Sequence, residues 1–247
     1  EQLAYEGTAM SKYGDVVVVS LNHRLNVLGY LDLSPFGEKY EGSANAGNLD
    51  LIAALSWVQE NIRNFGGDPD NVTIFGQSGG GGKVISMLAS PEAEGLFNQA
   101  IVQSGSERYI EKDTAKKITE KTLEILGITD NQIEQLKEVT YATLDAAATE
   151  ALKQVGAELG TSLRWSPVLD EDNIPSNLQA WTNDVPVMVG SVFGEMNCWT
   201  ALDPNETNKN SWTDEEVDAK LTEKYGDKAE AVKEAFLKAY PEKSACE

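Results

Sequence analysis

A serine flanked by glycines, in the run Gly76-Gln77-Ser78-Gly79-Gly80, follows the β-forming residues 72–75 and precedes the apolar run ISMLA. A side chain held on a sharp strand-to-helix turn needs neighbours without a Cβ at positions −2 and +2, because the backbone packs against itself there. Such a turn lifts the serine Oγ clear of the sheet and aims the following N–H at the same point. The pattern therefore predicts Ser78 as a nucleophile and Gly79 as an oxyanion-hole donor, with a plain tight turn as the alternative.

The neighbouring run Gly79-Gly80-Gly81-Gly82-Lys83 invites a second hypothesis, a phosphate-binding loop between a strand and a helix. That loop has the pattern G-x-x-x-x-G-K-[ST], in which the hydroxyl after the lysine holds magnesium. Here Gln77 occupies the position of the first glycine, and Val84 occupies that of the hydroxyl residue. Two defining positions fail, which argues against nucleotide binding.

Four apolar runs must supply the strands that position these residues. They are almost continuously apolar rather than alternating, which is typical of parallel strands buried on both faces. The four predicted strands are Asp15–Leu21, Val72–Phe75, Gln99–Gln103 and Val185–Val189. Apolar residues at helical spacing predict a helix over Asn48–Asn64, and a second helix, Gly82–Ala89, follows the serine and stops at Ser90-Pro91.

The second half of the chain changes character and shows charged, amphipathic helical patterns. Three of them, Asp113–Leu126, Asp130–Val139 and Leu144–Leu159, have no strand between them. We interpret residues 113–160 as a helical insertion that caps the sheet and shapes a substrate pocket. A further helical stretch, Asp214–Tyr240, follows the last predicted strand.

Composition narrows the class of protein. A chain of 247 residues with 41% hydrophobic residues suits one globular domain, and a net charge of −20 argues against nucleic acid and anionic membranes as partners. An acidic, solvated surface without a specific partner is the plainer interpretation of that charge. No apolar run is long enough to span a bilayer.

The sequence contains little information about the protein's localisation or the role of its cysteines. The opening residues EQLAYEG contain no initiator methionine, basic segment or apolar signal core, so the localisation is unknown. The two cysteines, Cys198 and Cys246, have no neighbour that could share a metal, and we expect two ordinary thiols.

Three long stretches carry a resemblance to a known family. The stretches are GDVVVVSLNHRLNVLGYL, ANAGNLDLIAALSWVQENIRNFGGDPDNVTIFGQSGGG and GLFNQAIVQSG, with thinner matches in SPVLDEDNIP and VPVMVGSVFGE. They resemble the carboxylesterase type B family, which includes the cholinesterases and many bacterial carboxylesterases. The resemblance implies an α/β-hydrolase fold over a single catalytic domain, 1–247. It also implies cleavage of a small-molecule carboxylic ester through a Ser-Glu-His triad and an acyl-enzyme, without a metal or an organic cofactor.

The acid of that triad has one matching candidate. Glu195 lies in the loop after the last predicted strand, where catalytic groups collect in open parallel sheets. The family carries its glutamate in a similar segment, so Glu195 is predicted as the triad acid, with a solvated loop carboxylate as the alternative. Three nearby acids (Asp170, Glu171 and Asp172) fit a surface turn better. Ser104, after the third predicted strand, matches a family serine near the acid and is predicted to support it, with a simple strand-end cap as the alternative.

The base of the triad has no matching residue. The single histidine, His23, precedes Ser78, whereas the family's histidine follows the acid. The HGGG-type segment that completes the family's oxyanion hole should precede Gly14 and is absent. We therefore expect an internal part of an esterase about twice this long, and we expect a structural role for His23.

Two functions stay open at this stage. One is a serine carboxylic-ester hydrolase whose base lies outside this sequence. The other is a catalytically silent binding module, because the same family includes members that kept the fold for cell adhesion. The sequence identifies neither the ester nor the oligomeric state.

Overall fold

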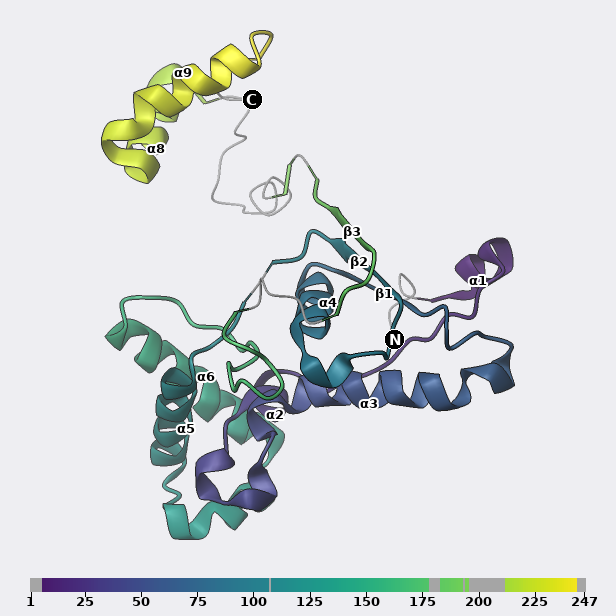
Figure 1. Ribbon diagram of the computed structural model, residues 1–247. Coiled ribbons are helices and arrows are strands. Elements are labelled where there is room, and N and C mark those ends of the chain that lie inside the picture. Colours follow the sequence, from purple (N-terminus) through teal and green to yellow (C-terminus); the bar gives the residue numbers. More distant parts are fainter. Residues whose placement is uncertain (1–5, 107, 178–182, 193, 196–211, 244–247) are drawn as a thin grey trace. The chain divides into compact units, whose positions relative to one another are not determined.

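A computed structural model describes residues 6–106, 108–177, 183–192, 194–195 and 212–243 (Figure 1). The chain divides into two parts, Glu1–Ser191 and Val192–Glu247, and each is described by itself. The predicted single domain over 1–247 stays a prediction. Cys198 and Cys246 lie outside the described residues.

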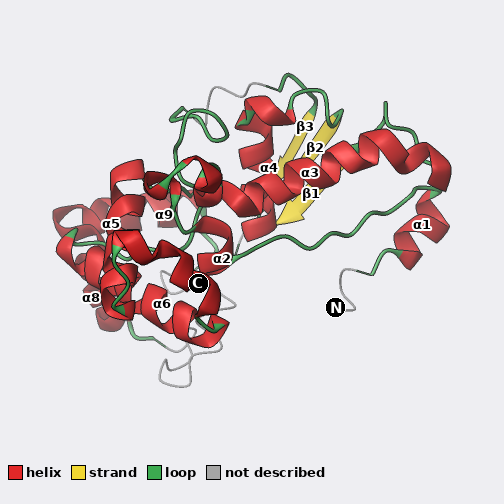
Figure 2. Ribbon diagram, turned by 90° about the horizontal axis from the view of Figure 1, so that it is seen from below, coloured by secondary structure: helices red, strands yellow, loops and turns green. Residues whose placement is uncertain are grey.

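Three parallel strands form the sheet of the first part, in the order β1-β2-β3 (Figure 2). Phe75, Ile101 and Met188 pair across the three strands, which fixes the register. The strands are β1 (Thr73–Gln77), β2 (Gln99–Gln103) and β3 (Val187–Gly190). Three of the four predicted strands are thus confirmed, two of them with their bounds shifted by one or two residues.

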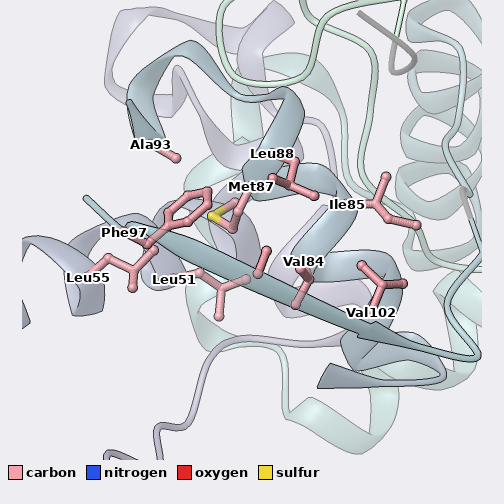
Figure 3. Packing of buried hydrophobic residues seen from close by; sticks show 10 residues of the cluster. Leu51, Leu55, Val84, Ile85, Met87, Leu88, Ala93, Phe97 and Val102 are labelled. Atoms are coloured by element: carbon pink, nitrogen blue, oxygen red, sulfur yellow. The ribbon is translucent and has the colours of Figure 1, made fainter. Parts of the chain in front are cut away.

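Helices cover one face of this sheet. α3 (Ala46–Asn61) and α4 (Gly79–Ala89) pack over it, and their side chains form a core with those of β2 (Figure 3). Leu88 is fully buried there. On the opposite face Phe75 is 52% exposed and Met188 68% exposed, so the expectation of burial on both faces is wrong within the described residues.

The predicted strand Asp15–Leu21 is also wrong. α1 spans Thr8–Gly14, and Asp15 ends it in a left-handed conformation with φ of 50°. Residues 16–25 then run without regular structure, and Val17 and Leu21 lie about two-fifths exposed, at 42% and 40%. β-Forming residues make a strand only where a neighbouring strand pairs with their backbone, and no described strand pairs with this segment.

The residues predicted to form a helical insertion are helical, whereas their role as a cap over the sheet stays a prediction. These residues contain α5 (Lys112–Leu126), the 3-10 helix Asp130–Glu138 and α6 (Tyr141–Glu158). α5 and α6 pack on each other and share a buried cluster with Ala44. α2 (Asn26–Tyr30) contributes Val27 to a second cluster with α6. A prediction of amphipathic helices was therefore sufficient to locate this layer, although its middle piece is a 3-10 helix.

The chain segments before and after these helices meet in an isolated bridge. Ile110 and Val168 form an isolated parallel bridge, in which Ile110 N–H donates to Pro167 O over 2.8 Å. The buried Asn45 amide group fastens the same place, because Asn45 Nδ2 donates to Val168 O and Val168 N–H donates to Asn45 Oδ1, both over 2.8 Å. Nothing in the sequence pattern pointed to Asn45.

The second part contains a pair of helices, α8 (Asp214–Tyr225) and α9 (Ala229–Ala239). Thr213 and Glu216 cap the start of α8 reciprocally, side chain to backbone. This capping satisfies N–H groups that a helix start otherwise leaves unpaired. No helix among the described residues has the length and apolar character needed to cross a membrane.

Candidate active site

Ser78 sits on a sharp turn between β1 and α4. Its backbone has φ of 55° and ψ of −118°, a conformation that residues other than glycine rarely adopt. Ser78 N–H donates to Gln103 O over 2.9 Å, which ties the turn to the end of the neighbouring strand. A strained, exposed serine at the carboxyl end of a parallel strand has the backbone geometry expected of a nucleophile elbow.

The glycines around Ser78 divide into close and open positions. A Cβ on Gly76 would lie 2.3 Å from both the carbonyl carbon and oxygen of Gly80, so Gly76 must lack a side chain. At Gly80 an added Cβ would meet no atom within 4 Å. The expectation that both −2 and +2 positions pack too tightly for a Cβ therefore holds for Gly76 and is wrong for Gly80.

The start of α4 presents backbone N–H groups to the same edge. The first bond that closes this helix runs from Gly82 N–H to Ser78 O over 3.0 Å, so Gly79 N–H precedes the helical hydrogen bonds. The helix has no side-chain cap. A helix start of this kind favours negative charge, which suits Gly79 as an oxyanion donor.

Ser104 occupies the equivalent place on the next strand. Gln77 pairs with Gln103, so Ser78 and Ser104 each follow the last paired residue of adjacent strands. Ser104 also has positive φ, 48°, and its N–H donates to Gly190 O over 2.7 Å. The two serines therefore lie at one edge of the sheet, as the sequence predicts. The proposed support of the acid by Ser104 stays a prediction.

Glu195 belongs to the second part of the chain, and Ser78 belongs to the first. Within the second part, Val192 N–H donates to Glu195 Oε1 over 2.9 Å. The role of Glu195 as triad acid thus stays a prediction. Asp170 closes a turn instead, because its Oδ1 accepts from the N–H groups of Asn173 and Ile174.

His23 lies on a loop that is fastened to α3. Its Nδ1–H donates to Arg24 O over 3.0 Å. Arg24 forms a bidentate ion pair with Asp50, Nε to Oδ2 over 2.9 Å and Nη2 to Oδ1 over 2.7 Å. Sequence reasoning missed this pair, because residues 24 and 50 come together only through the packing of the loop on α3.

The electrostatic surroundings of His23 favour its neutral form. Burial lowers the pKa of His23 and outweighs the hydrogen bond to Arg24 O, while the charge of Lys83 lowers it further and that of Asp50 raises it. Burial also lowers the pKa of Lys83. The hydrogen bond and the half-buried setting are those of a structural histidine.

We expect His23→Gln to reduce the free energy of unfolding by about 1 kcal/mol at pH 7.5, through the altered ring packing and hydrogen bond. A lowered pKa means that the unfolded chain binds the proton first, so His23 destabilises the fold as pH falls through about 6.5. In urea unfolding, the difference in the free energy of unfolding between wild type and variant should therefore be smaller at pH 5.5 than at pH 7.5. A difference that widens towards low pH would contradict this assignment.

Comparison with known proteins fits this geometry. The carboxylesterase family pattern matches residues 1–246 of the chain. The chain belongs to the carboxylesterase family. One relative, the para-nitrobenzyl esterase of Bacillus subtilis (strain 168), is 40% identical over 196 residues, which cover 77% of this chain and 40% of that protein. Human carboxylesterase 3 is 50% identical over 102 residues, 41% of this chain and 17% of its own.

Solved structures place the fold among the α/β-hydrolase esterases. An esterase from anaerobic Clostridium hathewayi, described as able to hydrolyze aliphatic aromatic polyesters, is 44% identical with a TM-score of 0.75 and matches 99% of this chain and 49% of its own. The carboxylesterase EST55 of Geobacillus stearothermophilus is 37% identical, with a TM-score of 0.71 and coverage of 90% and 46%. This chain thus spans less than half the length of each of these relatives.

Proposed function

We propose that this chain carries the nucleophile and the acid of a serine carboxylic-ester hydrolase. The observation that supports this most directly is the strained backbone of Ser78, with φ of 55°, between a parallel strand and the uncapped start of α4. Strain of this kind persists where the surrounding structure over-determines it, and it clusters at functional sites.

The proposed reaction proceeds through an acyl-enzyme. Ser78 Oγ attacks the carbonyl carbon of the ester while a histidine base takes its proton, and the carbonyl oxygen becomes an oxyanion that accepts from Gly79 N–H. The C–O bond to the alcohol then breaks, and the alcohol leaves with the proton from the histidine. Water enters by the same steps and releases the carboxylic acid. Glu195 orients the histidine and stabilises its cation.

His23 is not the proposed base. It precedes the serine in the chain, contrary to the order that α/β hydrolases follow, and its Nδ1–H donates to the backbone carbonyl of the next residue, Arg24. The alternative function is a binding module with the esterase fold. Such a protein would contain Ser78 but no base to activate it.

Labelling with a fluorophosphonate separates these two functions. An activated serine forms a phosphonyl adduct within minutes at micromolar reagent, whereas an ordinary serine stays unlabelled. In a preparation that also contains the histidine base, we expect one adduct by intact mass, located on Ser78 by peptide mapping. Ser104→Ala is the matched control, because Ser104 ends the neighbouring strand and also has positive φ. In that preparation, labelling of a different serine, or of none, would favour the binding module.

A further inference from the structure

We propose that a backbone contact between Gly81 and Gly105 positions the nucleophile turn. It involves a glycine outside the five-residue serine motif and a glycine on a different strand end. A Cβ on Gly81 would lie 2.7 Å from Gly105 Cα, and a Cβ on Gly105 would lie 2.7 Å from the Gly81 carbonyl carbon. Each residue thus leaves room only for the backbone of the other.

The contact reaches Ser78 through one carbonyl group. A Cβ on Gly81 would also lie 3.2 Å from Gln103 O, and that oxygen accepts the Ser78 N–H over 2.9 Å. A methyl group at position 81 therefore presses on the acceptor that holds the strained turn. Side-chain contacts could give way by a rotamer change, but two backbones pressed together must separate.

The contact between Gly81 and Gly105 is part of a larger interface between the first turn of α4 and the residues that follow β2. A Cβ on Gly82 would lie 2.9 Å from Ser106 O, and a Cβ on Gly105 would lie 2.6 Å from Cγ1 of the buried Val102. Gly80, one residue before Gly81, has no atom within 4 Å of its Cβ position. The close fit is therefore specific to the side of α4 that faces the β2 corner.

The consequence is that Gly81 and Gly105 act as positioning residues. They set the distance from the start of α4 to the end of β2, and with it the place of Ser78 Oγ and Gly79 N–H. Errors of about 1 Å in such groups reduce turnover by about 100-fold. This consequence rests on the proposed function of Ser78, whereas the contact itself can be tested without catalysis.

Amide hydrogen exchange in Gly81→Ala and Gly105→Ala tests the proposal directly. We expect Ser78 N–H to exchange about tenfold faster in each variant, because its bond to Gln103 O loosens. Two N–H groups report on the rest of the fold: Ser90, at the far end of α4, and Ala100, within β2, bonded to Ser86 O and Pro186 O. Their exchange should stay within about twofold of wild type. Gly80→Ala is the matched control and should leave Ser78 unchanged.

Three results would overturn the proposal: unchanged exchange at Ser78 in both variants, equal acceleration at Ser78, Ser90 and Ala100, or the same acceleration in Gly80→Ala. Gly81→Ala and Gly105→Ala must unfold cooperatively for this comparison to report on a folded protein. If neither does, Gly82→Ala provides the milder test, since its single close contact is with Ser106 O. Exchange at Ser78 should then still rise selectively, and its absence would equally overturn the proposal.

Turnover supplies a second readout. In a preparation that hydrolyses p-nitrophenyl acetate, kcat per titrated Ser78 should fall about 10- to 100-fold in Gly105→Ala with KM changed less than about threefold. A purely structural role would reduce the number of active molecules and leave kcat per titrated serine unchanged, which would overturn the positioning role. If the wild type shows no serine chemistry in a preparation that contains the histidine base, the proposed function fails while selective exchange at Ser78 still supports the contact.

Discussion

In a form of the protein that hydrolyses p-nitrophenyl acetate, Ser78→Ala should lower kcat by about 10⁶-fold, because removing the nucleophile of a serine hydrolase has an effect of that order. The expected loss is far larger than for any other serine of the chain. Alanine has no Oγ, so no acyl-enzyme can form, although an oxyanion donor such as Gly79 N–H would remain.

Stability and a second serine provide the controls for this result. Alanine at position 78 keeps a Cβ in the same strained conformation, with φ of 55°, so the free energy of unfolding should change by less than about 1 kcal/mol. Ser104→Ala should retain turnover within about tenfold of wild type, as a supporting rather than reacting group. Substantial activity in Ser78→Ala, together with loss in Ser104→Ala, would refute the assignment.

Glu195→Gln should reduce kcat by about 10⁴-fold and leave folding intact. A neutral amide cannot stabilise the imidazolium that forms when the serine is deprotonated, and an acid-to-amide change in a serine protease has an effect of this size. The amide oxygen of glutamine can still accept the Val192 N–H, so the local loop should persist. Steady-state kinetics on both proteins measure the ratio.

Asp172→Asn is the matched control for that charge change. Asp172 is exposed in the turn that Asp170 closes, so its neutralisation should alter kcat by less than about twofold. If Glu195→Gln lowers kcat by less than about tenfold, as little as the control does, Glu195 is a solvated loop carboxylate and not the triad acid.

Local sequence patterns predicted the elements around Ser78 well. β2 has the predicted bounds, Gln99–Gln103, and α4 ends at Ala89 before Ser90-Pro91, as the residue before a proline favours. The elbow was predictable because its signals lie within ten consecutive residues. Helical spacing likewise located α5 and α6.

Features that depend on partners distant in sequence were not predictable. The run Asp15–Leu21 has strand-forming residues, yet strand formation also needs a neighbour, and residue types alone do not report one. The contact between Gly81 and Gly105, and the clamp that Asn45 forms with Val168, join segments that no periodicity connects. The sequence alone does not distinguish a glycine that is required for close backbone contact, such as Gly81, from one with room for a side chain, such as Gly80.

The bridge between Ile110 and Val168 has a consequence for variation in length. Because the bridge joins Ile110 to Val168, the chain between these two residues forms a closed loop whose ends are held together. Lengthening a flexible loop changes its closure entropy only slowly, by about 0.6 kcal/mol for each doubling. The exposed turn 160–162 after α6 can therefore gain residues with little effect on the strands below, whereas the link between α5 and α6 is held by the buried Ile133.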